Sequence, residues 1–582
     1  HMALSADTLG SRTTALGYKA LQTQNFTTAT DTYNVAVGYA AGTAITTGKE
    51  SIFIGGLVGD AYTSGSFNVG MGYIALTSDT LGQYNTALGY AALATQNFTT
   101  STNSYNTAVG ANAGLVLTTG IQNVLVGAGA GDALTDADNN TALGAFSLSA
   151  DTKGDKSVAV GVVALASQNF TTVTDTFNTA VGYSAGSAVT TGVQNTLVGG
   201  RAGDALTDAD FNTAVGERSL SADTLGSKST AIGSLALNQQ NFTTATDTFN
   251  TAVGFQAGTA VTTGTSNTFI GALAGDAVTT GDLNVAIGTG ALGENTVGDR
   301  NIAIGVNSLG NFNPPSNADT YNVAIGLNAG IAVTTGTHNT IIGGLAGDAM
   351  TTGVNNTFVG YNAASGGVVT GSANVAVGVQ AGFSLTSGGD SVCIGTDAGV
   401  SLTSGGNNLF LGHDAGRTGS PGGNYTTQSN NIVLGDENIS SFNCQVALTV
   451  ASDERDKTDF VDLDLGLDFV KALEPVTYYW DKRSKYGDKT AVDYDLDVQT
   501  PDGTHKEDWM DVGFKAQSVQ ALEEAAGYKL SDKKNLTVSL TKDGKQYGLK
   551  YEKFIPILVK AIQDQDAIIQ SLTARIAALE GE

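Results

Sequence analysis

The chain has 582 residues, with 28 Lys and Arg against 54 Asp and Glu, so its formal net charge is −26. Gly accounts for 76 residues, about twice the usual share, whereas Pro accounts for only 6. So negative a charge excludes the usual modes of binding nucleic acid or an anionic membrane surface, because both depend on Lys and Arg.

Other classes of protein are excluded by what the sequence lacks. Two Cys are too few for a disulfide scaffold. The four His lie far apart, and they form neither a zinc-ligand pattern nor a His-based catalytic triad. No apolar run approaches the roughly 18 residues that a membrane-spanning helix needs. We therefore expect no metal, no cofactor, no nucleic-acid partner and no membrane insertion.

The charge is spread unevenly along the chain. Residues 1–450 hold 10 Lys and Arg and 28 Asp and Glu, while residues 451–582 hold 18 and 26. Gly divides in the opposite way, with 68 before the boundary and 8 after it, and both Trp lie after it. The composition therefore predicts two different domains joined near residue 450.

A nine-residue motif recurs along the first part. It reads approximately N-[TV]-[AFL]-[VIL]-G-x-x-A-[GL], as in N-T-A-V-G-Y-S-A-G at 178–186, and we count 24 copies. One 21-residue step followed by three 17-residue steps makes a block, and this block repeats with a 72-residue period from Gly17 to Gly305. A fixed period of this kind indicates a solenoid.

Each copy predicts one coil of a parallel β-solenoid. The alternation before the central Gly has the period of a strand, a second small-residue stretch follows, and T-T-G or S-G-G segments indicate turns. A 17-residue unit fits two short strands and two turns. Stacked at the strand spacing, the coils give a rod on the order of 110 Å long. We expect this mainly β rod to occupy residues 1–440.

The predicted coil is too narrow to bury a large core by itself. Its residues are mainly Ala, Gly and Val, and Ala recurs where larger side chains would fit. We interpret the repeated Ala as a second surface that packs closely against a partner, and we expect three chains side by side.

The segments S-V-A-V-G at 157–161 and S-T-A-I-G at 229–233 resemble the head repeats of trimeric autotransporter adhesins. The five-residue core is short, but it recurs throughout the first part. The resemblance implies a homotrimeric, left-handed parallel β-roll.

The 21-residue steps contain extra residues. Four of the five contain Q-N-F-T-T, and N-F-N-P-P-S at 311–316 takes its place in the fifth. Extra residues in a solenoid emerge as loops on one face, often the binding face. Asn and Thr beside an aromatic ring suit carbohydrate; the alternative is that each Phe packs under its loop as an anchor. The candidate receptor residues are Asn25, Phe26, Asn97, Phe98, Asn169, Phe170, Asn241 and Phe242.

The second part has the composition of a small α+β domain. We expect a short helix at 465–473, a strand at 476–480, a helix that opens at 513–522 and a long helix from Lys550 onward. Apolar residues of the last helix repeat with the heptad period, which predicts a coiled coil over about 552–580. Ile at one seam position with Leu at the other favours a coiled coil of two helices, whereas the β-roll needs three chains, so the number of chains stays open. The predicted trimerisation seam is Ile555, Leu558, Ile562, Gln565, Ile569, Leu572, Ile576 and Leu579.

Four motifs in this part resemble the endosialidase-type C-terminal intramolecular chaperone. They are S-D-E-R-D-K at 452–457, L-E-P-V-T-Y-Y-W at 473–480, G-F-K-A-Q at 513–517, and the final Y-E-K-F-I-P-I-L-V-K-A-I-Q-D-Q with its heptads. That family occurs on phage tailspikes and tail fibres, assembles the trimer, and commonly cuts itself off. The resemblance implies a chaperone domain at 452–582, preceded by a linker and cleavage junction at 441–451.

The same resemblance assigns the cut to the Ala451–Ser452 bond, with Ser452 as nucleophile and Lys457 as base. A Ser–Lys pair needs a neutral amine, whereas the neighbouring acids favour the charged form. A spacing of five also places the two side chains on different faces of a helix, so a turn must bring them together. The alternative is that S-D-E-R-D-K is only a solvated hinge.

The combined interpretation is a homotrimeric, adhesive, receptor-binding fibre, whose chaperone cleaves itself once and which is not a turnover enzyme. Its expected partners are two further copies and a host cell-surface glycan or protein receptor. Its expected location is a virion tail fibre or another extracellular or cell-surface position, after synthesis in the bacterial cytoplasm. The alternatives are a tailspike polysaccharide depolymerase, which needs two carboxylates about 5–10 Å apart in a groove, and a bacterial surface adhesin or predator fibre built from the same modules.

Overall fold

The computed structural model describes residues 2–446, 448–489 and 493–581. The fold is mainly β, as predicted: about 24 turns of parallel β-solenoid precede a small C-terminal region that ends in a long helix. The chain divides into two compact units, His1–His338 and Asn339–Glu582.

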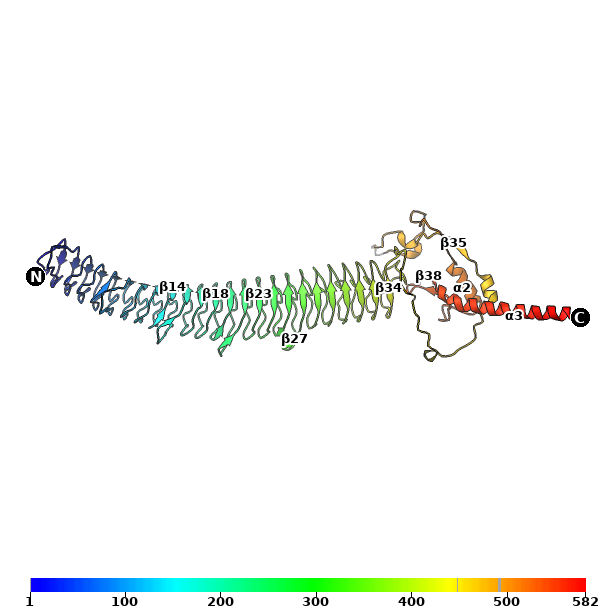
Figure 1. Ribbon diagram of the computed structural model, residues 1–582, viewed down its shortest axis with the longest axis horizontal. Coiled ribbons are helices and arrows are strands. Elements are labelled where there is room, and N and C mark those ends of the chain that lie inside the picture. The colour runs from blue at the N-terminus through cyan, green and yellow to red at the C-terminus, as the bar shows by residue number, and fades with distance from the viewer. Residues whose placement is uncertain (1, 447, 490–492, 582) are drawn as a thin grey trace. The chain divides into compact units, whose positions relative to one another are not determined.

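One three-residue strand per coil forms the solenoid sheet of the first unit, and Figure 1 shows these strands stacked side by side. They are β2 (Thr14–Leu16), β4 (Val35–Val37), β5 (Ile52–Ile54), β6 (Val69–Met71), β8 (Thr86–Leu88), β10 (Thr107–Val109), β11 (Val124–Val126), β12 (Thr141–Leu143), β14 (Val158–Val160), β16 (Thr179–Val181), β17 (Thr196–Val198), β18 (Thr213–Val215), β20 (Thr230–Ile232), β22 (Thr251–Val253), β23 (Thr268–Ile270), β24 (Val285–Ile287), β26 (Ile302–Ile304) and β28 (Val323–Ile325).

Each 21-residue coil carries one additional short strand, which pairs in parallel with a short strand of the coil before it. The pairs are β1 (Gly10–Ser11) with β3 (Thr30–Asp31), β7 (Gly82–Gln83) with β9 (Thr102–Asn103), β13 (Gly154–Asp155) with β15 (Thr174–Asp175), β19 (Gly226–Ser227) with β21 (Thr246–Asp247), and β25 (Gly298–Asp299) with β27 (Ala318–Asp319).

The alternation within each strand sets the two faces of the sheet. Ala159 in β14 is fully buried, while Val158 and Val160 are half-buried. Ala159 pairs in parallel register with Ala142 on one side and Ala180 on the other, and these small side chains share the coil interior with the fully buried Leu148 and Leu165. The interpretation of the Ala column as the partner-facing surface was therefore wrong: Ala points into the coil, and the Val, Ile, Leu and Thr column points outward.

The prediction of two strands per coil was also wrong. The second small-residue stretch is a series of turns, because residues such as Val163 and Leu165 have φ of 53° and 49° and cannot continue a strand. The central glycine is required by close stacking. Gly161 has φ of 137°, and a Cβ on it would lie 2.2 Å from the carbonyl oxygen of Gly182 in the next coil.

A buried asparagine ladder joins neighbouring coils. The side-chain oxygen of Asn195 accepts the backbone N–H of Asn212 at 3.0 Å, and its Nδ2 donates to the carbonyl of Ala209 at 2.8 Å. The backbone N–H of Asn195 in turn donates to the side chain of Asn178 at 2.9 Å. Each buried amide thus satisfies backbone groups that the narrow coil would otherwise leave without partners.

The second unit begins with further coils of the same kind. Their strands are β29 (Thr340–Ile342), β30 (Thr357–Val359), β31 (Val375–Val377), β32 (Val392–Ile394), β33 (Leu409–Leu411) and β34 (Ile432–Leu434). Cys393 occupies the buried Ala position of β32, as the repeat predicts, and its burial raises the pKa of the thiol to about 12.

The rest of the second unit is a small α+β region. Its elements are η1 (Glu454–Asp456), α1 (Leu467–Ala472), β35 (Val476–Tyr478), η2 (Arg483–Lys485), η3 (Leu496–Val498), β36 (Asp511–Gly513), α2 (Ala516–Ala525), β37 (Val538–Leu540), β38 (Tyr547–Leu549), η4 (Tyr551–Lys553) and α3 (Phe554–Glu580). Leu465, Phe469, Val519, Val538, Phe554 and Ile557 form its apolar core.

The helices and the strand predicted here are confirmed, with corrected bounds. The helix expected from 513 begins at Ala516, because Gly513 ends β36 and pairs with Val476 of β35 in an antiparallel ladder. The last helix begins at Phe554 after a 3₁₀ turn. The hairpin of β37 and β38 was not predicted. Among the described residues, no helix is both long enough and apolar enough to cross a bilayer.

The asparagine ladder makes a stability prediction. Asn195→Ala removes the side-chain partner of two buried backbone groups, the N–H of Asn212 and the carbonyl of Ala209. Each group left unsatisfied lowers the free energy of unfolding by about 1–3 kcal/mol. We expect the guanidinium midpoint of the full chain to fall accordingly. The exposed Thr191→Ala serves as the control and is expected to change stability by less than about 0.5 kcal/mol. Equal midpoints for the two variants would contradict a structural role for the ladder.

Candidate functional site

The predicted cleavage junction, 441–451, has an exposed apolar face. Residue 447 lies outside the described residues, and in the remainder of the junction no helix or strand is formed. Val446, Leu448 and Val450 alternate along it and are 76–79% exposed. An alternating apolar segment of this kind has the pattern of a strand with one buried face, and that face is uncovered in the single chain.

A short 3₁₀ turn brings the two predicted catalytic residues together. Asp453 caps the turn Glu454–Asp456 by accepting the backbone N–H of Arg455. The turn reverses the chain, so Lys457 Nζ lies 2.6 Å from Ser452 Oγ and 3.1 Å from the carbonyl oxygen of Ser452. This is the turn that the five-residue spacing required, although a catalytic role for either residue stays a prediction.

The acidic neighbours of Lys457 are partly neutralised. The Arg455 guanidinium binds the Asp453 carboxylate, with Nη2 2.6 Å from Oδ2, and this contact lowers the pKa of Asp453 and raises that of Arg455. Asp453 is thus paired with Arg455 and not with Lys457. The sequence had suggested that the nearby acids would hold the lysine charged, and the geometry removes one of them from that role.

The arrangement contains the groups needed for a Ser–Lys acyl transfer. Ser452 Oγ would attack the carbonyl carbon of Ala451 as its proton passes to Lys457 Nζ, and that proton would then pass to the departing backbone nitrogen of Ser452. The resulting ester between Ala451 and Ser452 Oγ would be hydrolysed by water, leaving a carboxylate and a free amine. Ser452 and Lys457 are both exposed in the single chain, so a low-dielectric setting for the neutral amine requires this segment to be covered.

Contacts within the second unit span the predicted scissile bond. The buried Glu437 forms an ion pair with Lys489, and its carbonyl accepts Lys482 Nζ at 2.8 Å. The backbone N–H of Asn424 donates to Asp543 at 3.2 Å. These contacts join residues before and after the Ala451–Ser452 bond, so release of the C-terminal region needs them to break in addition to that bond.

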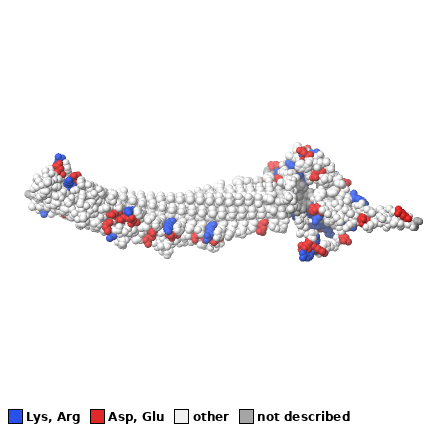
Figure 2. Space-filling model, in the orientation of Figure 1, with Lys and Arg blue, Asp and Glu red and all other residues white. Residues whose placement is uncertain are grey.

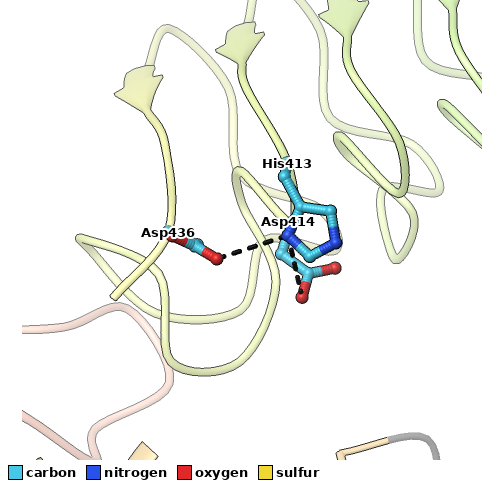
Figure 3. A group of neighbouring side chains, drawn as sticks. All are labelled: His413, Asp414 and Asp436. Carbon is cyan, nitrogen blue, oxygen red and sulfur yellow. Dashed lines mark hydrogen bonds and ion pairs between the residues drawn. The ribbon is translucent and has the colours of Figure 1, made fainter. Parts of the chain in front are cut away.

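A second polar cluster lies in the last coils, and Figure 3 shows its three side chains, His413, Asp414 and Asp436. His413 Nδ1 lies 3.3 Å from Asp436 Oδ2 and 3.7 Å from Asp414 Oδ2. Burial opposes ionisation of Asp436, but hydrogen bonds from Asn438 and His413 outweigh it and lower the pKa of Asp436. Arg417 Nη1 lies 3.0 Å from the other oxygen of Asp414, so a guanidinium of the chain is paired with the cluster.

Sequence reasoning missed this cluster and found no metal-ligating set. His413 and Asp436 each follow the central glycine of their coil, and the 23-residue step between them hides that equivalence. Alignment of consecutive coils on Gly412 and Gly435 would have found it.

The candidate receptor loops are only partly available for binding. Phe26, Phe98, Phe170 and Phe242 are 5–7% exposed, so their rings cannot serve as the apolar platform that carbohydrate binding was expected to use. Asn25, Asn97, Asn169 and Asn241 remain exposed. The structure favours the alternative, in which each Phe anchors its loop.

The predicted seam residues lie along one exposed face of α3. Ile555, Leu558, Ile562, Ile569, Leu572, Ile576 and Leu579 are 44–75% exposed, and Gln565 is exposed among them. On the first turns of the helix, Phe554, Ile557 and Ala561 lie beside this seam and are buried, and Phe554 and Ile557 belong to the core of the α+β region.

Comparison with known proteins identifies part of this region. Residues 452–528 match the model of the family Peptidase_S74, described as chaperone of endosialidase. No curated protein and no solved structure matches the chain. The matched range begins at Ser452, the residue after the predicted scissile bond, and the resemblance seen in the sequence is confirmed for these residues.

The cleavage hypothesis predicts a simple pattern of masses. The parent chain is expected to give two fragments, split after Ala451, in a denaturing intact-mass measurement. Ser452→Ala and Lys457→Met are expected to give one full-length chain, because the first removes the nucleophile and the second removes the base.

Ser441→Ala and Lys471→Met are the matched controls, since both residues are exposed and lie outside the Ser–Lys pair. They are expected to be cut like the parent. A full-length parent, or a cut Ser452→Ala chain, would remove the catalytic assignment.

Proposed function

We propose that the chain is a homotrimeric receptor-binding fibre of a phage tail, in which the C-terminal region assembles and registers three solenoids before it is cut off. The observation that carries the proposal is the exposed heptad seam of α3, in a helix whose first turns pack on a region matched to a chaperone family.

The seam supports assembly because isolated helices do not leave a long apolar stripe in water. Its a and d positions follow one another without interruption from Ile555 to Leu579, which is the pattern of a coiled-coil interface. The stripe lies beside the core residues Phe554 and Ile557 on the first turns of α3, and beyond Ala561 no described residue of the helix is buried. A partner helix therefore meets the stripe without disturbing the fold of its own domain.

Besides the seam of α3, the coils of the solenoid present an apolar surface of their own. Outward-pointing residues of the solenoid strands, such as Ile232 in β20 and Ile270 in β23, are each 39% exposed. In Figure 2 the face of the sheet carries almost no charge, while Lys, Arg, Asp and Glu gather in separate groups on the loops. An uncharged, β-branched column suits packing against identical columns, and the likeness to trimeric adhesin heads favours three chains.

A chaperone solves a problem of register for such an assembly. A slip of one coil would pair strands as alike as Thr179–Val181 and Thr196–Val198, and a slip by the full 72-residue period would restore almost every contact. Parallel pairing between distant residues also nucleates slowly. A compact domain that associates first fixes the register and raises the local concentration of the chains.

The receptor-binding part of the proposal rests on the surface loops and on the family. The C-terminal region resembles the endosialidase-type chaperone, a family that occurs on phage tailspikes and tail fibres. The loops of the first unit present exposed groups that recur at constant spacing. Removal of the chaperone would leave the solenoid trimer kinetically trapped and exposed on the virion.

The seam variant tests assembly and adhesion together. Ile569→Asp with Ile576→Asp places charges at two a positions, and we expect loss of the three-chain mass in light scattering and loss of adsorption to a panel of bacterial cells.

Ala567→Asp with Ala574→Asp is the matched control, because it places the same charges on the outer face of the same helix. It is expected to retain both properties. Retention of the three-chain mass in the seam variant would contradict the role of α3, and a trimer that adsorbs to no cell would contradict the receptor-binding function.

A further inference from the structure

Five exposed aromatic side chains recur at 72-residue intervals in the first unit. Each follows the extra strand of a 21-residue coil and precedes a buried asparagine of the ladder, and all are between 47% and 56% exposed. They are Tyr33, Tyr105, Phe177, Phe249 and Tyr321.

The backbone at these positions does not favour aromatic residues. Their φ angles are 48–52°, a left-handed conformation that costs least for Gly or Asn. In the 17-residue coils the equivalent position accepts side chains as different as Glu50, Lys156 and Ser266. In the five longer coils it is always Tyr or Phe, so the ring itself is the feature that the longer coils share.

A cation and a carboxylate accompany the ring in four of the five coils. Lys156 Nζ lies 5.2 Å from the centre of the Phe177 ring and 2.6 Å from the Asp175 carboxylate. The same trio recurs in the next block, where Lys228 lies 5.4 Å from the ring and 2.5 Å from the carboxylate. The complete trios are Arg12, Asp31 and Tyr33; Lys156, Asp175 and Phe177; Lys228, Asp247 and Phe249; and Arg300, Asp319 and Tyr321.

The coil of Tyr105 replaces charge with further rings. Tyr84 occupies the place of the cation, and its ring stacks on Tyr105 with centroids 5.1 Å apart. Phe67 stacks on Tyr84 at 4.7 Å, and Asn103 takes the place of the carboxylate. An exposed ring with hydrogen-bonding groups beside it is therefore present in all five coils.

In four of the five longer coils a buried phenylalanine supports this surface. The backbone N–H of Phe170 donates to Asp151 at 3.1 Å, and Asp151 also accepts Gln168 Nε2 at 2.6 Å. Thr152 Oγ1 donates to the carbonyl of Phe170 at 2.6 Å. The loop is thus fixed before any ligand arrives, which lowers the entropic cost of binding.

We propose that these five clusters are glycan-binding sites, and that their ligand is a polysaccharide with a repeating structure. This inference rests on the proposed receptor function. The apolar face of a sugar ring stacks on Tyr or Phe, while Lys or Arg donates to its hydroxyl oxygens and Asp or Asn accepts from its hydroxyl groups.

The spacing of the clusters favours a polymer over a single sugar. Successive clusters are separated by four coils, or about 19 Å at the spacing of stacked strands. They occupy the same position of their coils, so they face the same side. Five weak sites on one chain, engaged by one polymer, raise the apparent affinity by about 10²–10⁴ without any new contact.

Removal of the rings tests the inference. The variant carries Tyr33→Ala, Tyr105→Ala, Phe177→Ala, Phe249→Ala and Tyr321→Ala. The matched control carries Tyr18→Ala, Tyr39→Ala, Tyr90→Ala, Tyr183→Ala and Phe255→Ala, five rings of the same unit that are 45–58% exposed and lie outside the five clusters.

Adsorption is measured on immobilised dextran, mannan and galactan and on bacterial lipopolysaccharide, with the three-chain mass as the folding check. We expect the parent to bind at least one of these probes, the cluster variant to lose about 100-fold or more in apparent affinity, and the control to change little. Equal binding by the parent and the cluster variant, or binding of the parent to none of the probes, would overturn the glycan assignment.

Treated cells separate this inference from the function on which it rests. Periodate, which cleaves sugar diols, is expected to abolish adsorption of the parent to cells, and protease treatment of the cells is expected to preserve it. The reverse pattern would show a protein receptor, overturning the glycan sites while leaving the receptor function intact. A parent that adsorbs to no untreated cell would instead contradict the proposed function itself.

Discussion

The direct stacking of each coil on the next is the constraint from which the rest of the structure follows. A Cβ on Gly161 would lie 2.2 Å from the carbonyl of Gly182, so the coils meet at a distance that only glycine permits. The buried amide of Asn195 then fixes each coil on its neighbour through backbone groups. Equivalent residues therefore form columns along the stack: an interior of Ala, Leu and Phe, an outward apolar column, and exposed loops that return once in every block of four coils.

The same regularity explains why the chain carries a domain of a different composition. Columns of equivalent residues hold the coils firmly but do not distinguish one coil from another, so the solenoid cannot set its own register between chains. The α+β region has a unique core around Phe469 and Phe554, and α3 presents a single apolar stripe. The Ser452–Lys457 pair lies at the start of that region. Hydrolysis of the Ala451–Ser452 bond there would separate the domain that sets the register from the solenoid whose register it has set.

The repeat period predicted the solenoid and the number of coils, because the central glycine and the alternation before it are local features. The direction in which the Ala column faces was predicted wrongly, because alternation alone does not say which face of a strand is buried. Contacts between coils were harder to predict. Phe170 resembled a binding residue in a loop sequence, yet it packs beneath that loop. Lys156 lies a full coil before Asp175 and Phe177 in the sequence, and the three form one cluster only when the coils are aligned. The five-residue spacing of Ser452 and Lys457 predicted that a turn must bring them together, but the sequence did not show that this turn is a 3₁₀ helix at Glu454–Asp456.

Refolding of the chain with and without its C-terminal region tests the central claim most directly. The Ser452→Ala chain, in which the region stays attached, and a chain that ends at Ala451 are denatured in guanidinium, diluted, and examined by native mass spectrometry. The account predicts that the attached region yields a three-chain assembly and that the shortened chain yields aggregates or single chains. Equal recovery of three-chain solenoid from both, or only single chains from the first, would contradict it.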